Sequence, residues 1–144
     1  MTEQTNVKAL PEMHPETETF FKSGFRSELV IKLCSDCQRF HHYPRAICPH
    51  CLSDRTVWIR ASGKGTIYSF NIIRQNPSPG WRDKVPYVIA YVDLQEGVRM
   101  MTNIVGYEDV GLKIEDIKVG MPVQATWERL ENVAIPQFRP IVAR

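Results

Sequence analysis

Four cysteines arranged as two C-x-x-C pairs constrain this chain more than any other feature. The pairs read CSDC from Cys34 to Cys37 and CPHC from Cys48 to Cys51, with ten residues between them. Each pair can form a tight knuckle whose two thiolates face one point, and two knuckles supply the four sulfurs of a tetrahedral zinc site. The sequence therefore predicts one structural Zn²⁺ per chain, with no coordination position open to a substrate. Iron is the main rival metal, because the same thiolates can hold it.

Two disulfides are the other use for four cysteines, and they fit this sequence less well. The first residues, MTEQTNVKALPEMHPETE, are polar and acidic, unlike a secretion signal, and no run approaches the roughly 18 apolar residues that cross a bilayer. We therefore expect a cytoplasmic protein whose thiols stay reduced. His41, His42 and His50 lie in or beside the knuckles. Four cysteines already fill the coordination sphere, so we expect these histidines to pack or to face solvent.

The pattern of apolar residues predicts a short helix before the cysteines. Pro15 suits a first helical turn, Phe20 and Phe21 would anchor the helix in a core, and Gly24 comes just after its expected last residue. The predicted parts of the chain are an N-terminal arm with this helix (residues 1–27), a zinc ribbon (28–62) and a third, larger domain (63–144).

The third domain reads as a chain of short strands. Its five strand-like runs are GTIYSFNIIRQ from Gly65, PYVIAYVDL from Pro86, VRMMTNIV from Val98, PVQATWERL from Pro122 and FRPIVA from Phe138. The stretch LKIEDI, between the third and fourth runs, can form a helical turn. Five strands with one brief helix between the third and fourth are the order expected of an OB-fold barrel, so the predicted fold class is mainly β.

The sequence contains few groups that could catalyse a reaction. It has no phosphate-binding glycine loop, no G-x-S-x-G and no H-E-x-x-H, and zinc would occupy all four cysteines. The carboxylates that remain as general-base candidates are typical solvated loop residues: Asp93, Glu96, Glu108 and Asp109. We therefore predict no catalytic residue. The formal net charge is +2, with an acidic start, a basic stretch over residues 21–92 and an acidic segment over 93–119. Such a distribution is compatible with a polyanion bound on one face or with an unevenly solvated surface.

Several segments together resemble a known protein family. They are the aromatic helix, the C-x-x-C pair, YPRAICPHC, SGKGTIYSFNIIRQNPSPGW, PYVIAYVDLQEGVRMMTNIVG, LKIEDIKVGMPVQATWE and PQFRP, within residues 16–142. The family consists of acyl-CoA-associated proteins that join an N-terminal rubredoxin-like zinc ribbon to an OB-fold. Several members lack the zinc ligands, whereas this chain keeps all four.

The resemblance implies a non-catalytic subunit of an enzyme complex. Family members are small partners of thiolases or of aldolases and lyases with a thiolase-like fold, or are fused to hydratases. The partner would supply the nucleophile and the acid and base groups, and the substrate would be a coenzyme A ester. Thiolases of aromatic-acid degradation, such as benzoylsuccinyl-CoA thiolase, are the first partners to consider, and sterol side-chain aldolases the second.

One loop offers the groups that coenzyme A would need. Its phosphates call for cationic side chains and its adenine for a planar wall. The loop after the first barrel strand supplies such residues, and Arg139 near the C-terminus is a further phosphate or partner contact; the predicted set is Arg74, Asn76, Trp81, Arg82, Lys84 and Arg139. Pro77 and Pro79 favour the alternative that this loop is a stiff surface element or a docking contact for the partner.

Two other functions remain open from the sequence. OB-folds and zinc ribbons both occur in proteins that bind single-stranded nucleic acid, and Tyr68, Phe70 and Arg74 could form an aromatic and basic face. The modest net charge and the acidic segment at 93–119 argue against it. A free-standing acyl-CoA carrier is the second alternative, and isolation as a stable monomer with CoA affinity would favour it.

Overall fold

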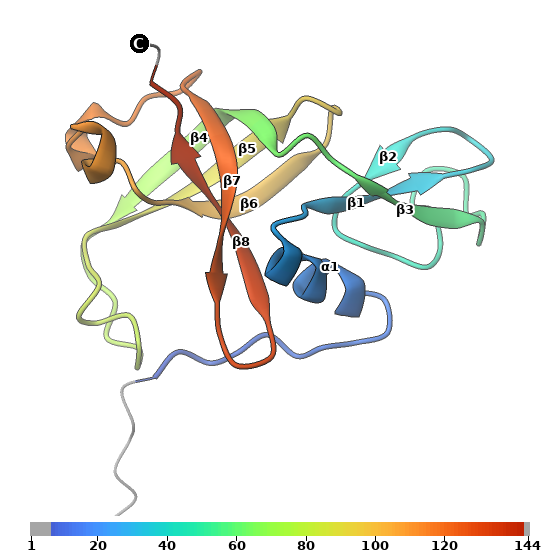
Figure 1. Ribbon diagram of the computed structural model, residues 1–144, viewed down its shortest axis with the longest axis horizontal. Coiled ribbons are helices and arrows are strands. Elements are labelled where there is room, and N and C mark those ends of the chain that lie inside the picture. The colour runs from blue at the N-terminus through green and yellow to red at the C-terminus, as the bar shows by residue number, and fades with distance from the viewer. Residues whose placement is uncertain (1–6, 143–144) are drawn as a thin grey trace, which may run out of the picture.

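The computed structural model describes residues 7–142, so the first six residues of the predicted arm lie outside the described part. A short helix, α1 (Glu18–Ser23), and a 3-10 turn, η1 (Gly24–Arg26), precede three ribbon strands, β1 (Val30–Cys34), β2 (Phe40–His41) and β3 (Thr56–Arg60). Five further strands follow: β4 (Lys64–Ile73), β5 (Tyr87–Leu94), β6 (Arg99–Ile104), β7 (Pro122–Arg129) and β8 (Ala134–Pro140) (Figure 1). None of the helices within residues 7–142 is long and apolar enough to cross a membrane.

The five later strands form a closed barrel in the order β4-β5-β6-β8-β7. Neighbouring strands pair antiparallel except β6 and β8, which run parallel, and the contact of β4 with β7 closes the barrel. Between β6 and β7 lie two 3-10 turns, η2 (Glu108–Val110) and η3 (Ile114–Asp116), of which the second falls in the predicted LKIEDI stretch. The sequence therefore predicted the fold class correctly: a short helix, a four-cysteine ribbon and a five-stranded OB-fold barrel.

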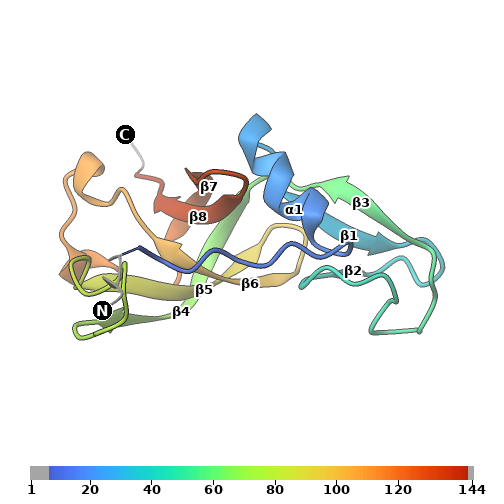
Figure 2. The ribbon, with the colours of Figure 1, turned by 90° about the horizontal axis from the view of Figure 1, so that it is seen from below.

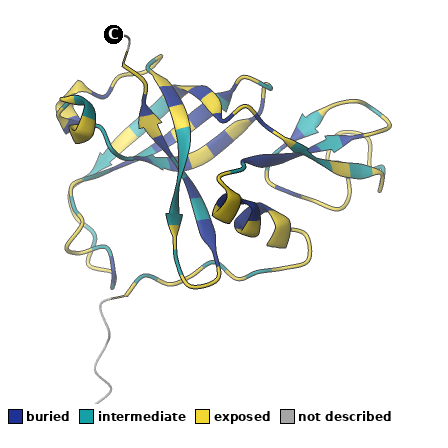
Figure 3. Cartoon of the chain, in the orientation of Figure 1, coloured by how far each residue is buried: buried dark blue, intermediate teal, exposed yellow. Residues whose placement is uncertain are grey.

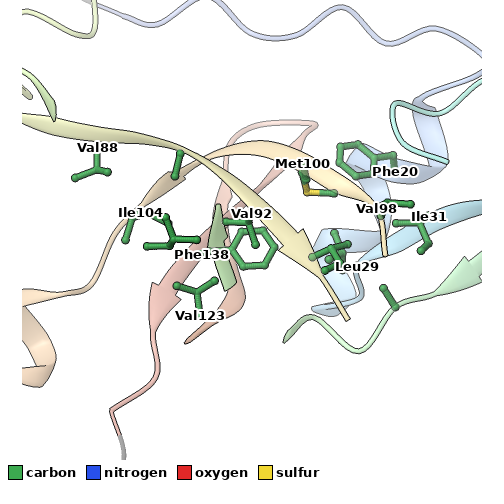
Figure 4. Packing of buried hydrophobic residues seen from close by; sticks show 14 of the residues in the cluster. Phe20, Leu29, Ile31, Val88, Val92, Val98, Met100, Ile104, Val123 and Phe138 are labelled. Carbon is green, nitrogen blue, oxygen red and sulfur yellow. The ribbon is translucent and has the colours of Figure 1, made fainter. Parts of the chain in front are cut away.

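Alternation of apolar and polar residues explains the barrel. In β5 the side chains of Val88, Ala90, Val92 and Leu94 are buried, while those between them are more exposed, because successive side chains of a strand point to opposite faces (Figure 3). These residues belong to the same packed cluster as Phe138, which has no exposed surface and lies beside Val92 (Figure 4).

The ribbon and the barrel share one hydrophobic core. Phe20 and Phe21 from α1 and Ile31 from β1 belong to the same packed cluster as Val98 and Met100 at the near end of the barrel (Figure 4). Full burial of one such side chain contributes about 1.5 to 3 kcal/mol to stability. The helix therefore packs against both the ribbon and the barrel and holds them together.

A close contact at Gly24 holds α1 against the barrel. Gly24 follows the last residue of the helix as predicted, but its φ of −63° is an ordinary helical value; the left-handed residue is Ser27, with φ of 57°. A Cβ atom on Gly24 would lie 2.4 Å from Cδ1 of Trp127 and 2.7 Å from Cβ of Ala134. Glycine is therefore required here by the approach of β7 and β8.

The segment before α1 also contacts both parts of the molecule. It runs along the barrel towards the ribbon (Figure 2). Near its start, Lys8 pairs with Glu128 at 2.9 Å, and near its end a carboxylate oxygen of Glu16 accepts a hydrogen bond from the backbone amide of Ala46. The described part of the predicted N-terminal arm is therefore bound to the surface.

Candidate metal centre and ligand cavities

The four predicted metal ligands come together at the far end of the ribbon. Cys34 ends β1, and the other three lie in the two knuckle loops; their Sγ atoms all lie within 4.8 Å of one another. Cys34 and Cys51 are 3.5 Å apart, and Cys37 and Cys48 are 3.7 Å apart. A tetrahedral ion with metal–sulfur bonds of about 2.3 Å would place its sulfurs about 3.8 Å apart. The cluster is thus consistent with a structural zinc ion.

The two knuckles have the same local geometry, which explains the repeated C-x-x-C spacing. In each, the residue four positions after the first cysteine adopts a positive φ, 60° at Gln38 and 66° at Leu52, and its amide donates to the carbonyl of that cysteine. Further backbone amides point at sulfur: Cys37 N lies 3.5 Å from Cys34 Sγ, and His50 N lies 3.4 Å from Cys48 Sγ. Such donors stabilise thiolates.

Electrostatics also favour a cation at this point. The backbone amide of Cys37 is the main cause that lowers the pKa of Cys34 to about 7. The amide of Ser53 lowers the pKa of Cys51, but hydrogen bonding by the Cys34 thiol and burial outweigh it and raise that pKa to about 12. Four adjacent thiols therefore do not ionise together unaided, whereas a divalent cation removes this obstacle and binds the thiolates directly.

An ion pair on the surface ties the two knuckles together. Asp36 in the first knuckle accepts hydrogen bonds from Ser53 and Arg55, which follow the second knuckle. The Arg55 hydrogen bond is the main reason that the pKa of Asp36 falls to about 2. This contact helps to hold the two pairs of cysteines at a fixed separation.

The histidines near the knuckles are not part of the ligand cluster in the described residues. His41 is buried, and His42 packs between Phe20 and Tyr43, with ring centroids 5.2 and 5.5 Å away. Burial lowers the pKa of His42 to about 4, so its ring is neutral at pH 7. His42 thus helps to pack the ribbon against Phe20 of α1.

The residues predicted to contact coenzyme A do not form one site: some line one cavity, Arg139 lines another, and the rest line neither. Trp81 and Lys84 line an open cavity of about 650 Å³ beside β6 and β7. Trp81 stacks on Tyr87 at 4.8 Å, and Asn76 donates to the Tyr87 hydroxyl at 2.8 Å. Arg74 and Arg82 are exposed and do not line this cavity.

The N-terminal segment covers part of that cavity, which the sequence did not indicate. The ammonium group of Lys8 lies 4.5 Å from the centre of the Trp81 ring and is paired with Glu128. The planar wall that was predicted for adenine therefore already has a cation on it.

Arg139 lies in a different cavity, of about 820 Å³, where the ribbon joins the barrel. Arg60 and Arg129 line the same cavity, although the sequence did not single them out. No local motif could have revealed them, because the three arginines come from β3, β7 and β8.

The other candidate groups have structural partners. Asp93 forms a bidentate ion pair with Arg99, and a carboxylate oxygen of Glu96 accepts a hydrogen bond from the Ser62 amide. The Arg99 guanidinium covers the exposed ring of Tyr68 at 3.4 Å, whereas Phe70 packs against the core. Of the face proposed for nucleic acid, the Tyr68 ring is therefore covered by Arg99 and Phe70 is partly buried, while Arg74 is exposed.

Two family models match the chain. One is the ChsH2 rubredoxin-like zinc ribbon domain, over residues 24–57, and the other is the ChsH2 C-terminal OB-fold domain, over residues 58–128. A solved structure described as "Ltp2-ChsH2(DUF35) aldolase" contains a chain that is 34% identical, with a TM-score of 0.79; the match covers 92% of this chain and 100% of that chain.

Curated relatives carry three kinds of name. A probable enoyl-CoA hydratase alpha subunit of Thermomonospora curvata is 36% identical over 98% of this chain, which spans 44% of that longer protein. A DUF35 domain-containing scaffold protein of Methanocaldococcus jannaschii is 33% identical over 72% of this chain and 70% of its own length. The benzoylsuccinyl-CoA thiolase subunit BbsA of Geobacter metallireducens is 25% identical over 84% of this chain and 81% of its own length.

Proposed function

We propose a function from one premise: the chain belongs to the ChsH2 family, whose members join a rubredoxin-like zinc ribbon to a C-terminal OB-fold domain. The proposed function is that of a scaffold subunit in a complex with a thiolase-like enzyme, either a thiolase or an aldolase, that processes a coenzyme A ester. The partner supplies the nucleophile and the acid and base groups. This chain helps to bind the coenzyme A ester and to assemble the complex.

The observation that carries the proposal is the match to the aldolase structure. The whole of the DUF35 chain in that structure aligns with this one at 34% identity, so both domains and their arrangement correspond. The shared core explains how such a chain serves as a scaffold: because α1, the ribbon and the barrel pack together, the molecule presents a rigid surface to a partner.

Zinc is the metal that we propose for the ribbon. Cys34, Cys37, Cys48 and Cys51 would hold it, and zinc would provide a redox-inert cross-link between the two knuckles. Because four thiolates complete the coordination sphere, the ion is structural. Four reduced thiols also suit a cytoplasmic setting.

The loop from Asn76 to Lys84 is the proposed contact with the coenzyme A ester or with the partner at its entrance. Its support is the open cavity that Trp81 and Lys84 line, and the ring of Tyr87 that holds Trp81 in place. Lys84 at the cavity mouth suits a phosphate, and adenine would lie on Trp81 only after Lys8 has left that ring. Arg82, exposed on the same loop, would reach a phosphate or a partner carboxylate.

Co-purification of the tagged chain from its native source, with metal analysis, tests the scaffold role. One zinc per chain and a thiolase-like enzyme in the eluate are the expected result. A zinc-loaded monomer without any enzyme would contradict the proposal, as would a nucleic acid in the enzyme's place.

Substitutions then test the loop in the reconstituted complex. Trp81→Ala or Arg82→Ala should raise KM for the CoA ester or weaken assembly, whereas Arg26→Ala, an exposed arginine in η1, is the matched control. Unchanged KM together with unchanged assembly would exclude the loop while leaving the scaffold role intact.

A further inference from the structure

The boundary between β6 and β8 is an opening in the wall of the barrel. In residues 7–142 the only ladder pair that joins these two parallel strands is Ile104 with Phe138. Two positions earlier on each strand, the Thr102 hydroxyl donates to the Pro136 carbonyl at 3.2 Å, so a side chain replaces the backbone pairing there. Nearer the ribbon, the two strands leave room for a groove between them.

Two adjoining cavities follow this boundary. One measures about 410 Å³ and lies beside α1, and the other measures about 270 Å³ and lies beside β5. Met101, Ile135 and Pro136 line both cavities, so together they form one groove, the seam groove. At its ribbon end Phe20 lies beside Met100 (Figure 4).

The lining of the seam groove carries no charge. None of its lining residues is an aspartate, glutamate, lysine or arginine, and all are aromatic or aliphatic apart from His42, Thr102 and Asn103. Burial lowers the pKa of His42 to about 4, so this ring is neutral at pH 7. Met101 and Tyr43 remain exposed, so a ligand can reach the groove. Such a lining favours an apolar ligand and disfavours a charged one.

The seam groove is free and continues into the cavity beside the loop of Trp81. None of residues 7–16 lines the groove, although Lys8 of that segment lies on the Trp81 ring. Trp81, Tyr87 and Asn103 line both the groove and the open cavity of about 650 Å³. Two positions along a strand, as from Asn103 to Met101, span about 7 Å. The flexible arm of coenzyme A can bridge such a separation.

We propose that the seam groove binds the acyl group of the coenzyme A ester and that this group is apolar and contains a ring. The proposal rests on the proposed function, because the rest of the same ester would lie at the loop of Trp81. The rings of Phe20 and Tyr43 suit an aromatic ring, and the Met101 thioether adapts to its edge. The chain would then help to select the acyl group, while the partner supplies the catalytic groups.

Nuclear magnetic resonance of the full zinc-loaded chain, with ¹³C-labelled methionine methyl groups, is the direct test. The probe is S-benzoyl-N-acetylcysteamine, a thioester without a nucleotide. The methyl signals of Met100 and Met101 should shift, whereas that of Met121, which does not line the groove, should not. S-acetyl-N-acetylcysteamine should bind at least tenfold more weakly, because it lacks the apolar ring that the groove would bury.

Substitutions at Met101 test the position of the site. Met101→Glu should weaken binding of the benzoyl thioester tenfold or more, because it places a charge beside an uncharged cavity. Met101→Leu keeps volume and polarity and should retain binding. Val119→Glu is the matched control, since Val119 is also an exposed apolar residue, 65% against 60% for Met101, and lies outside the groove. Circular dichroism verifies that each variant folds.

Three results would overturn the proposal. The first is equal affinity for the benzoyl and acetyl thioesters, or no shift at Met100 and Met101. The second is an equal loss in Val119→Glu, which would indicate nonspecific binding to apolar surface. The third is a chain that ignores the thioester but loses its enzyme partner in Met101→Glu, which would assign the groove to apolar side chains of a protein.

Competition with benzoyl-CoA distinguishes this proposal from the proposed function. Benzoyl-CoA should displace the benzoyl thioester, and Lys84→Gln should weaken binding of benzoyl-CoA but not of the nucleotide-free thioester. If benzoyl-CoA displaces the thioester and Lys84→Gln has no effect, the groove stands and the role of the loop fails. If benzoyl-CoA does not displace it, the groove does not hold the acyl group of a coenzyme A ester, whatever enzyme co-purifies with the chain.

Discussion

Replacement of Gly24 by alanine tests the contact that fixes the helix between the ribbon and the barrel. The backbone at this position is helical, with φ of −63° and ψ of −22°, so alanine can adopt it without backbone strain. In open space the change would stabilise the protein by about 0.4 to 1 kcal/mol by restricting the unfolded chain. Any loss of stability therefore measures the collision with β7 and β8.

The distances set the size of that collision. The new Cβ would lie 2.4 Å from Cδ1 of Trp127 and 2.7 Å from Cβ of Ala134, both more than 0.5 Å inside normal contact. Forcing a methyl group into a packed site costs roughly 1 to 3 kcal/mol. Because both approaches are this short, we expect a cost in the upper part of that range, about 2 to 3 kcal/mol, so that Gly24→Ala lowers the free energy of unfolding by about 1 to 2.5 kcal/mol once the backbone gain is subtracted.

Urea denaturation with zinc in excess, followed by circular dichroism, is the assay. With a slope of about 2 kcal/mol/M, the transition midpoint should fall by about 0.5 to 1.25 M. In a Trp127→Leu background the same substitution should cost much less, because the main collision partner is gone. An unchanged or higher midpoint for Gly24→Ala in the wild-type background would refute the reasoning.

Three further predictions concern the ribbon and the core. A strong zinc chelator should unfold the ribbon, since a unit this small relies on its metal, and NMR spectra should then show loss of the knuckle resonances with much of the barrel retained. The pKa of His42 is lowered to about 4 by burial. As pH falls below about 6.5, His42 therefore takes up a proton in the unfolded chain before it does so in the folded protein. The free energy of unfolding should fall by up to about 3 kcal/mol between pH 7 and pH 4. Urea titrations at several pH values should show a smaller dependence on pH in His42→Phe. Phe138→Ala should cost about 3 to 5 kcal/mol, because Phe138 is fully buried, and retention of the wild-type urea midpoint would contradict the barrel packing.

The sequence predicted the features whose causes are local. The C-x-x-C pairs indicated the cluster of four sulfurs because each knuckle is made by consecutive residues. The alternation in strands such as β5 indicated the barrel because half of each strand faces the core. Strand β2 was not predicted, since two residues, Phe40 and His41, are too short to show a period.

Features that join distant segments could not be predicted. Nothing in the sequence around Gly24 shows that Trp127 lies against it, and nothing around Trp81 shows that Lys8 covers its ring. The cavity that Arg60, Arg129 and Arg139 line is a further case, because Arg139 stood out only as a cation near prolines and the other two arginines come from β3 and β7.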